Sequence, residues 1–463
     1  MKTQCVVIGG GGAGLAAAMA AVESGVQSVI VLEKRGSLGG NTALATGLFA
    51  CESPVQARER IIADKDELFK RAMTWAHLDR IDPRIVRVFI NKSGDTIRWL
   101  EKMGLEFSIV PFFPNQQPRI WHCPKGRGAR LTQMLTERCR DRGVQFLLHS
   151  SAKKIKRSPE GRVAGIITEN KGEVINISAE SVIITTGGFG GNKALLKKYC
   201  PSYYDDMPLR GLPLEGDGIV LAAEAGAAID DFASLLKEGP RVNLNSWPLM
   251  QIERAPATLW VNTMGHRFVD EVAGDYPFES VNAILRQPDR QCYTLLDSGI
   301  RRHYEESKPG LETALQQEAD KSRVKIAGSW DEIACWIGAD PQALAHTIEE
   351  YNAFCDQGYD AVFAKERRYL IPLRIAPYYA IKNMAVFLDT IGGIKIDEHM
   401  AVMDHHQQPI PGLYAAGVIT SGWMGETYCG DLSGSAFGYA INSGRIAGEN
   451  AASYIMGNLP RAF

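Results

Sequence analysis

The chain has 463 residues, a net charge of −2, 45% hydrophobic residues and 22% charged residues. This composition is typical of a globular protein with roughly two or three domains, and it excludes a disordered chain. The nearly balanced charge gives no reason to expect nucleic acid or anionic lipid as a partner. Nine scattered cysteines without a Cys-x-x-Cys pair predict neither a disulfide framework nor a metal site, and they favour a reducing compartment.

The N-terminus runs directly into a strand-like segment, residues 5–8, which leaves no room for a signal peptide. The most apolar helical segment, residues 15–22, ends at Glu23, far short of the roughly 20 residues that a membrane span needs. We therefore expect a cytoplasmic protein without membrane insertion.

The first elements in chain order form a βαβ unit. Residues 4–8 and 28–32 have the pattern of buried strands, and the alanine-rich residues 15–24 between them have that of a helix. Helical patterns continue to about residue 103 and again over 131–142, before a strand at 144–148. A β-rich stretch follows, with strands at 163–167, 174–177 and 181–186.

The composition changes between about residues 239 and 372, where charged residues increase, glycines are few, and helices are predicted at 309–322 and 341–354. Strand and glycine patterns then return at 394–396 and 413–417, followed by a long helix over 432–454. The sequence therefore predicts an α/β protein with a Rossmann-like domain built from both chain ends, residues 1–238 and 373–463. An α+β domain, residues 239–372, is inserted between these two segments.

Residues 9–14 read G-x-G-x-x-G between the first strand and the first helix, and Glu33 ends the second strand. Glycines let the backbone approach a pyrophosphate, the helix N-terminus attracts its charge, and the acid can bind ribose hydroxyls. This motif alone leaves NAD and FAD open. A second glycine turn, residues 36–42, suits packing against a longer dinucleotide and favours FAD.

With these motifs the chain resembles the flavoprotein family of soluble fumarate reductases and succinate dehydrogenases, which includes urocanate reductase and the 3-ketosteroid dehydrogenases. The similarity runs nearly end to end, through residues 39–42, 185–188, 216–218, 265–271, 390–393, 412–417 and 444–448. The resemblance implies that the insert is a capping domain that closes over the flavin. It also implies FAD contacts at Gly9, Gly11, Gly12, Ala13, Gly14, Glu33, Lys34, Gly39, Gly40, Asn41, Thr42, Gly47, Thr186, Gly187, Asp217, Gly417, Ser433, Ser435 and Ala436.

Two departures from the family pattern concern the cofactor. Membrane-bound relatives attach FAD through a histidine at the position of Asn41, so non-covalent FAD is expected here. Relatives often have a glutamate where this chain has Val418, which removes one ribityl contact. The N-terminus of the helix near Leu432 to Ser435 is expected to stabilise the negative charge of reduced flavin, although packing alone would also explain that helix.

The cations with which fumarate reductases hold a dicarboxylate are replaced by other residues. The resemblance places Asp389, Asp431 and Glu238 at those positions, and Asp275 or Tyr276 at that of the proton-donor arginine. Acids would repel a dicarboxylate, so fumarate and succinate are not expected as substrates. Alternatively, each of these acids caps a helix or pairs with an arginine.

The 3-ketosteroid dehydrogenases match better at two tyrosines. Tyr276 follows Asp270 and Glu271 as their catalytic tyrosine follows Asn-Glu, and Tyr428 stands where their carbonyl-polarising tyrosine stands. One phenol would polarise a ketone oxygen, the other would exchange the adjacent C–H proton, and flavin would exchange the hydride. Ordinary packing of either ring is the alternative.

The resulting hypothesis is an FAD enzyme that introduces or reduces a C=C bond beside a carbonyl in a neutral, cyclic small molecule. Without a haem-binding motif or a second flavin domain, it needs a separate electron donor or acceptor. The alternatives are a fumarate-reductase-like reductase of an unsaturated carboxylate and a flavin electron-transfer subunit. His122 is expected to be structural, and His405 and His406 to lie in a solvated turn, so no metal site is predicted.

Overall fold

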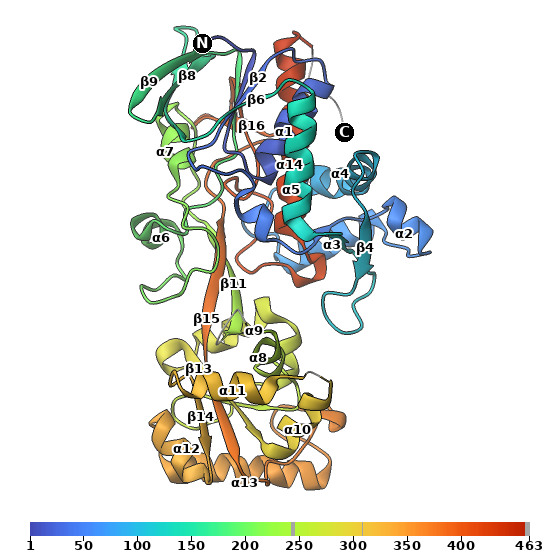
Figure 1. Ribbon diagram of the computed structural model, residues 1–463, viewed down its shortest axis with the longest axis vertical. Helices are drawn as coiled ribbons and strands as arrows, with labels where there is room; N and C mark the ends of the chain where they lie inside the picture. The colour runs from blue at the N-terminus through green and yellow to red at the C-terminus, as the bar shows by residue number, and fades with distance from the viewer. Residues whose placement is uncertain (242–245, 308, 459–463) are drawn as a thin grey trace. The chain divides into compact units, whose positions relative to one another are not determined.

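The computed structural model describes residues 1–241, 246–307 and 309–458. It divides into two compact units (Figure 1). Unit 1 comprises Met1–Leu236 and the chain from Leu388 onward, and unit 2 is Lys237–Phe387. The expected insert, residues 239–372, falls within unit 2. The chain crosses between the units inside β11 (Ser234–Arg241) and β15 (Tyr378–Ile391).

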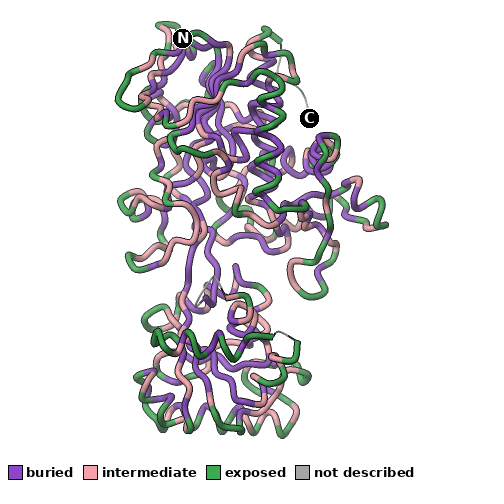
Figure 2. Tube along the Cα trace, in the orientation of Figure 1, coloured by how far each residue is buried: buried purple, intermediate pink, exposed green. Residues whose placement is uncertain are grey.

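Unit 1 is built on a six-stranded sheet with the strand order β16-β17-β10-β1-β2-β6. All neighbours pair in parallel except β16 and β17. The central strands β1, β2 and β10 are buried along their whole length, whereas the edge strand β6 is not (Figure 2). The strands are β1 (Cys5–Ile8), β2 (Val29–Leu32), β6 (Gln145–Leu147), β10 (Ser181–Ile184), β16 (Ala401–Met403) and β17 (Pro409–Ala415).

The register of this sheet brings distant segments to one edge. Ile8 of β1 pairs with Leu32 of β2 and with Ile184 of β10, so these three strands end at the same level. The residues that follow them, Gly9, Glu33 and Thr185, therefore meet at the carboxyl edge of the sheet, where doubly wound folds bind ligands.

Helices α1 (Gly12–Glu23), α5 (Arg127–Asp141) and α14 (Ser435–Ile455) pack beside one another in unit 1 (Figure 1). Glycines permit the close approach of α14 to α1. A Cβ atom on Gly444 would lie 2.2 Å from the carbonyl oxygen of Ala13, and one on Gly448 would lie 2.3 Å from that of Ala17. The first and last helices of unit 1 are therefore in backbone contact.

Two small sheets and further helices complete unit 1. The antiparallel sheet β7-β8-β9 contacts β2 and β10, and the second small sheet has the order β3-β5-β4. The strands are β3 (Leu48–Phe49), β4 (Phe107–Val110), β5 (Trp121–Pro124), β7 (Ser150–Arg157), β8 (Val163–Asn170) and β9 (Glu173–Ser178). The helices are α2 (Pro54–Arg58), α3 (Lys65–Trp75), α4 (Pro83–Lys102), α6 (Lys193–Tyr199) and α7 (Asp217–Glu224).

Unit 2 has a sheet of the order β11-β15-β13-β12, with β14 also paired to β15. Its core includes the buried residues Leu295, Tyr351 and Tyr379. The remaining strands are β12 (Leu259–Val261), β13 (Gln291–Asp297) and β14 (Val324–Ala327). The helices are α8 (Trp247–Ile252), α9 (Pro277–Leu285), α10 (Ser298–Ser307), α11 (Leu311–Ala319), α12 (Trp330–Ile337) and α13 (Pro341–Gln357). Within the described ranges, no helix combines the length and apolarity needed to cross a bilayer.

Candidate cofactor and active site

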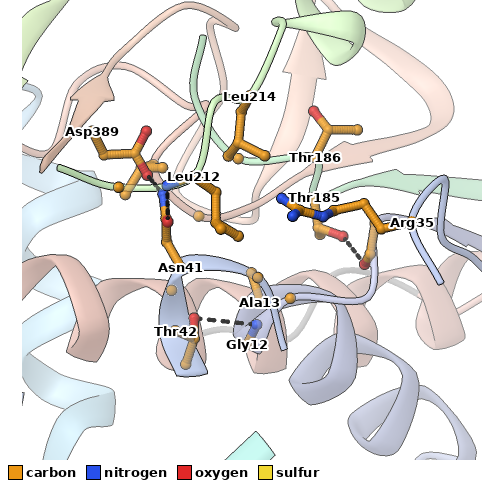
Figure 3. A pocket seen from close by; sticks show the side chains of 18 of the residues that line it. Gly12, Ala13, Arg35, Asn41, Thr42, Thr185, Thr186, Leu212, Leu214 and Asp389 are labelled. Atoms are coloured by element: carbon orange, nitrogen blue, oxygen red, sulfur yellow. Dashed lines mark hydrogen bonds between the residues drawn. The ribbon is translucent and has the colours of Figure 1, made fainter. Parts of the chain in front are cut away.

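A cavity of about 440 Å³ opens at the carboxyl edge of the unit 1 sheet, and all of its lining residues belong to unit 1 (Figure 3). Its volume is within the range of small-molecule and cofactor sites. Fourteen of the nineteen expected FAD contacts line it, namely Gly9, Gly11, Gly12, Ala13, Glu33, Lys34, Gly40, Asn41, Thr42, Thr186, Gly187, Asp217, Gly417 and Ala436.

The glycine turn lines this cavity, and steric contacts explain why two of its positions are glycine. Gly9 has a φ of +105°, and its Cβ would lie 2.5 Å from the carbonyl oxygen of Thr185. A Cβ on Gly14 would lie 1.9 Å from the carbonyl oxygen of Gly9. Gly11 is different, since its Cβ would meet only one atom, 4.0 Å away, and its backbone therefore faces open space. Helix α1 begins directly after it, so the positive end of the helix dipole is directed at the cavity.

Glu33 holds the turn from the end of β2. It is only 8% exposed, and its carboxylate accepts hydrogen bonds from the backbone N–H groups of Gly10 (2.9 Å) and Arg35 (2.8 Å). Next to it, Lys34 and Asp217 form an ion pair of 2.6 Å, and both line the cavity. This end has the acid after the second strand that binds an adenosine ribose in dinucleotide folds.

The other end of the cavity carries a buried carboxyl group. Asp389 is 7% exposed, and its Oδ2 accepts a hydrogen bond of 2.7 Å from Nδ2 of Asn41. The Asn41 Oδ1 accepts in turn from the N–H of Leu212, at 2.8 Å. Burial raises the pKa of Asp389 to about 6, although the hydrogen bonds from Asn41 and from the Thr390 N–H lower it. The carboxyl group therefore titrates close to neutral pH.

These features fit FAD. The turn and the α1 N-terminus can bind a pyrophosphate between a ribose-binding acid at one end and a wider space at the other. Thr186 lines this cavity, and its hydroxyl has no hydrogen-bond partner among the described residues, which leaves it able to bond to a ligand. The first turn of α14 adds Ala436, Phe437 and Ala440 to the lining.

Tyr428 lies at the N-terminus of α14. Its ring is buried, and its hydroxyl oxygen accepts a hydrogen bond of 2.9 Å from the N–H of Ala436. Burial raises the pKa of Tyr428 above its ordinary value, so the phenol stays protonated at neutral pH. A phenol that accepts from a helix N-terminus becomes a stronger donor through its own O–H.

Five expected FAD contacts do not line the cavity. Gly14 supports the turn from below, and Gly39 packs near the side chain of Thr132 in α5. A Cβ on Gly47 would meet the indole of Trp121 at 2.7 Å. Ser433 accepts a hydrogen bond from Gln116 (3.0 Å), and Ser435 donates to the carbonyl of Leu432.

Several lining residues were not anticipated from the sequence. Leu212 and Leu214, together with Arg210, come from a segment without a recognisable motif. They reach the cavity because Leu212 bonds to Asn41, 171 residues earlier. Arg35 also lines the cavity, and its position directly after Glu33 and Lys34 could have identified it as a lining residue from the sequence.

The other predicted pocket acids occupy different settings. Glu238, in unit 2, is paired with Arg241 through two contacts of 2.9 and 3.0 Å, which is the arginine-paired alternative. Asp431 is partly buried in a short 3₁₀ turn of unit 1, Gly430–Leu432, and does not line the cavity. Asp275 is a partly buried residue of unit 2.

Tyr276 in unit 2 is 37% exposed and stands between a 3₁₀ turn, Glu271–Asp275, and α9. The turn is anchored by Glu271, which is fully buried. Its carboxylate accepts from Arg267 through two contacts of 2.9 and 2.8 Å, and it pairs with Lys365 at 3.0 Å. The segment that carries Tyr276 is thus fixed to the core of unit 2 by a buried ionic network.

The three histidines considered from the sequence, His122, His405 and His406, do not line the cavity. His122 is fully buried, with Nδ1 2.9 Å from the Ile120 carbonyl and Nε2 2.7 Å from the Ser53 hydroxyl. Burial lowers the pKa of His122 to about 4, so the ring is neutral. His405 and His406 are exposed in a turn. In the parts of the chain that the structure describes, no group of three His, Cys, Asp or Glu side chains is placed to hold a metal.

Comparison with known proteins identifies the family of this chain. A profile of the FAD binding domain family matches residues 4–431. The vinyl phenol reductase of Lactiplantibacillus plantarum is 32% identical over 97% of this chain and 96% of its own. The fumarate reductase (cytochrome) of Shewanella frigidimarina is 30% identical over 97% of this chain and 77% of its own.

A solved structure shares the fold. The 3-ketosteroid delta1-dehydrogenase from Sterolibacterium denitrificans, in complex with 1,4-androstadiene-3,17-dione, superposes with a TM-score of 0.82 at 19% identity, over 98% of this chain and 99% of that one. The family resemblance predicted from the motifs is thereby confirmed. The chain belongs to the FAD binding domain family and is an FAD-dependent oxidoreductase of the group that acts on carbon–carbon double bonds.

Proposed function

We propose that the protein reduces or introduces a C=C bond next to a carbonyl in an uncharged, cyclic small molecule. The observation that carries this proposal is the buried carboxyl group of Asp389 at the end of the cofactor cavity away from Glu33. An ionised carboxylate at that position repels a dicarboxylate strongly in a poorly solvated site, and a protonated one gives a dicarboxylate no cation to bind. The same group suits a neutral molecule, which carries no charge to repel.

FAD, when bound, accepts or donates a hydride. Residues of the glycine turn and Glu33 would hold its pyrophosphate and ribose, and the first turn of α14 would meet the remainder. We propose non-covalent binding, because the side-chain nitrogen of Asn41 is an amide that already donates to Asp389 and is not a nucleophile. A histidine would be needed for the covalent link expected in membrane-bound relatives.

Two tyrosines are the proposed catalytic residues. Tyr428 would donate its O–H to the substrate carbonyl, which acidifies the adjacent C–H, and its bond from Ala436 N–H strengthens that donation. Tyr276 would transfer the proton at the carbon next to the carbonyl. Asp275 and Asp431 are proposed as further pocket residues, with Glu238 acting through its pair with Arg241.

We propose that electrons reach or leave the flavin through a separate donor or acceptor. We also propose a cytoplasmic location, because free cysteines such as Cys5, Cys51 and Cys139 persist in a reducing compartment.

The first experiment records the flavin absorbance of the anaerobic holoprotein before and after chemical reduction, while candidate substrates are added. The panel contains saturated cyclic ketones, cyclic enones, a vinyl phenol and fumarate. The vinyl phenol is included because a relative that matches along nearly its whole length is named for it, and because it is uncharged and cyclic. Bleaching by ketones, or reoxidation by enones, supports the proposal. Reoxidation by the vinyl phenol alone would keep an uncharged cyclic substrate but contradict the requirement for a carbonyl, which this compound lacks. Reoxidation by fumarate alone contradicts it and favours the unsaturated-carboxylate alternative.

The role of Tyr276 is tested with Tyr276→Phe, which should keep bound FAD but lose at least about a hundredfold in turnover, the range expected for a general acid or base. Tyr359→Phe is the matched control, because Tyr359 is a 64% exposed tyrosine of the same unit. Equal turnover of the two variants would eliminate Tyr276 as the proton-transfer residue. Reduction by an electron donor with no response to any organic substrate would instead indicate an electron-transfer subunit.

A further inference from the structure

The carboxyl group of Asp389 is closely surrounded by backbone atoms. Its Oδ2 accepts from Asn41 and its Oδ1 accepts from the Thr390 N–H, at 2.7 and 2.9 Å. A Cβ on Gly188 would lie 2.3 Å from Oδ1, so glycine alone leaves room for the carboxyl group there. Both groups that donate hydrogen bonds to this carboxyl group are neutral, and no cation is bonded to it among the described residues.

The position of this carboxyl group within the cavity follows from the dinucleotide-binding architecture. Figure 3 shows Asp389 and Asn41 on one side of the cavity and Arg35 on the other. In dinucleotide-binding folds the acid in the position of Glu33 binds the adenosine ribose and the glycine turn binds the pyrophosphate. The flavin ring of a bound FAD would therefore lie toward Asp389. The charged groups lining the cavity are Glu33, Lys34, Arg35, Arg210, Glu215 and Asp217, of which Arg210 comes from the segment that packs against Asn41.

We infer that Asp389 takes up a proton when the bound flavin is reduced and releases it when the flavin is reoxidised. The two electrons come from the separate donor, and they add negative charge to the cavity. One proton from solvent then bonds to a carboxylate oxygen of Asp389, and the negative charge of that group is lost. On reoxidation the O–H bond breaks and the proton returns to solvent. This inference goes beyond the proposed function, since it involves no organic substrate.

The energetics favour such a linkage. Burial already raises the pKa of Asp389 to about 6, so at neutral pH the group is mostly ionised but close to its titration point. Negative charge added nearby in a buried cavity raises the pKa further, because like charges disfavour ionisation. Each additional pKa unit is a tenfold increase in proton affinity. A modest shift is therefore enough to protonate the group at neutral pH.

The test is a potentiometric titration of the holoprotein with a chemical reductant between pH 5 and 9. One extra proton per two electrons steepens the fall of the midpoint potential by about 30 mV per pH unit, because a tenfold change in equilibrium constant is 29.6 mV for a two-electron couple. The wild type should show this additional slope from about pH 6 up to the higher pKa of Asp389 in the reduced protein, above which the slope returns to that of the flavin alone, and Asp389→Asn should lack it throughout. Below that pH the two proteins should converge, since the wild-type carboxyl group is then protonated in both redox states.

Asp397→Asn is the matched control. Asp397 is an aspartate of unit 1 that accepts backbone N–H bonds but does not line the cavity, so its variant should keep the wild-type slope. Parallel potential–pH lines for wild type and Asp389→Asn would overturn the inference. If Asp389→Asn does not retain FAD, the reduced-minus-oxidised infrared spectrum of the wild type decides instead. A carboxylic-acid C=O band that gains intensity on reduction, and shifts in D₂O, is expected, and its absence would refute the linkage.

Discussion

Glu271→Gln should destabilise unit 2 while leaving the cofactor cavity intact. Glu271 is fully buried and accepts from Arg267, Lys365 and the N–H of Trp260. Burial alone would raise the pKa of Glu271, but Lys365 and Arg267 hold it below its ordinary value, so the carboxylate is charged at neutral pH. In the variant, Arg267 and Lys365 remain buried and positively charged. The carboxylate still bonded to them is that of Asp360, which pairs with Arg267.

Removing one partner from a buried ion pair costs about 3–5 kcal/mol. A typical domain has only about 5–15 kcal/mol of stability, so the loss is a large fraction of the total. The corresponding fall in the unit 2 melting temperature is on the order of 10 °C. We expect this to appear as an earlier first phase of the tryptophan fluorescence change during urea or thermal unfolding, because four of the eight tryptophans, Trp247, Trp260, Trp330 and Trp336, lie in unit 2.

Flavin fluorescence serves as the internal comparison, since every residue lining the cavity belongs to unit 1. FAD release should begin at a denaturant concentration close to that of the wild type. Glu366→Gln is the matched control: Glu366 pairs with Arg368 at 2.8 Å, but both side chains are more than half exposed, so the cost should stay below about 1 kcal/mol. A Glu271→Gln protein as stable as this control would refute the assignment of the network as the anchor of the Tyr276 segment.

Three further outcomes are expected. The pKa of His122 is lowered to about 4, so the unfolded chain binds the proton first; wild-type stability should fall by up to about 3 kcal/mol between pH 6.5 and 4, and urea titrations of His122→Gln should show less of this loss. Gly14→Ala places a Cβ 1.9 Å from the Gly9 carbonyl oxygen and should weaken FAD binding at least about tenfold in a fluorescence titration; an unchanged Kd would show that the turn can move. Tyr428→Phe deprives the Ala436 N–H of its acceptor and should cost about 1–3 kcal/mol, measured as earlier flavin release on heating, whereas an unaltered release temperature would mean that another group replaces the phenol.

The cofactor fold could be predicted from sequence because its signals are local. The glycine turn, helix α1 and the strands on either side of it are consecutive, and the spacing of the glycines is itself the signal of a dinucleotide-binding turn. The return to this domain after the insert was also visible, since β17 and α14 have the apolar texture of buried elements. The strands and helices could be predicted from hydrophobic periodicity, and the turn from glycines in a spacing that a tight backbone turn requires.

The setting of individual site residues could not be predicted in the same way. Asn41 and Asp389 are 348 residues apart, and nothing in either segment indicates that they share a hydrogen bond. The sequence left two roles for Glu238, an acid of the pocket or the partner of an arginine. Its pair with Arg241, three positions along the same strand, is a contact that the sequence does not indicate. Segment 210–214 lines the cavity through tertiary contacts alone, so its residues carry no motif. The assignments of Tyr276 and Tyr428 remain predictions from the family pattern.

The division of unit 1 between the two chain ends has a consequence for synthesis in the cell. A ribosome completes all of unit 2 before it makes β17 and α14, which supply one side of the central sheet and the helix in backbone contact with α1. Domains generally fold as units while the chain emerges. Unit 2 is therefore expected to fold first. The N-terminal segment of unit 1 stays incomplete, with the apolar faces of β10 and α1 uncovered, until β17 and α14 have been synthesised. Chaperones that bind this protein during translation should accordingly bind mainly to the N-terminal segment of unit 1.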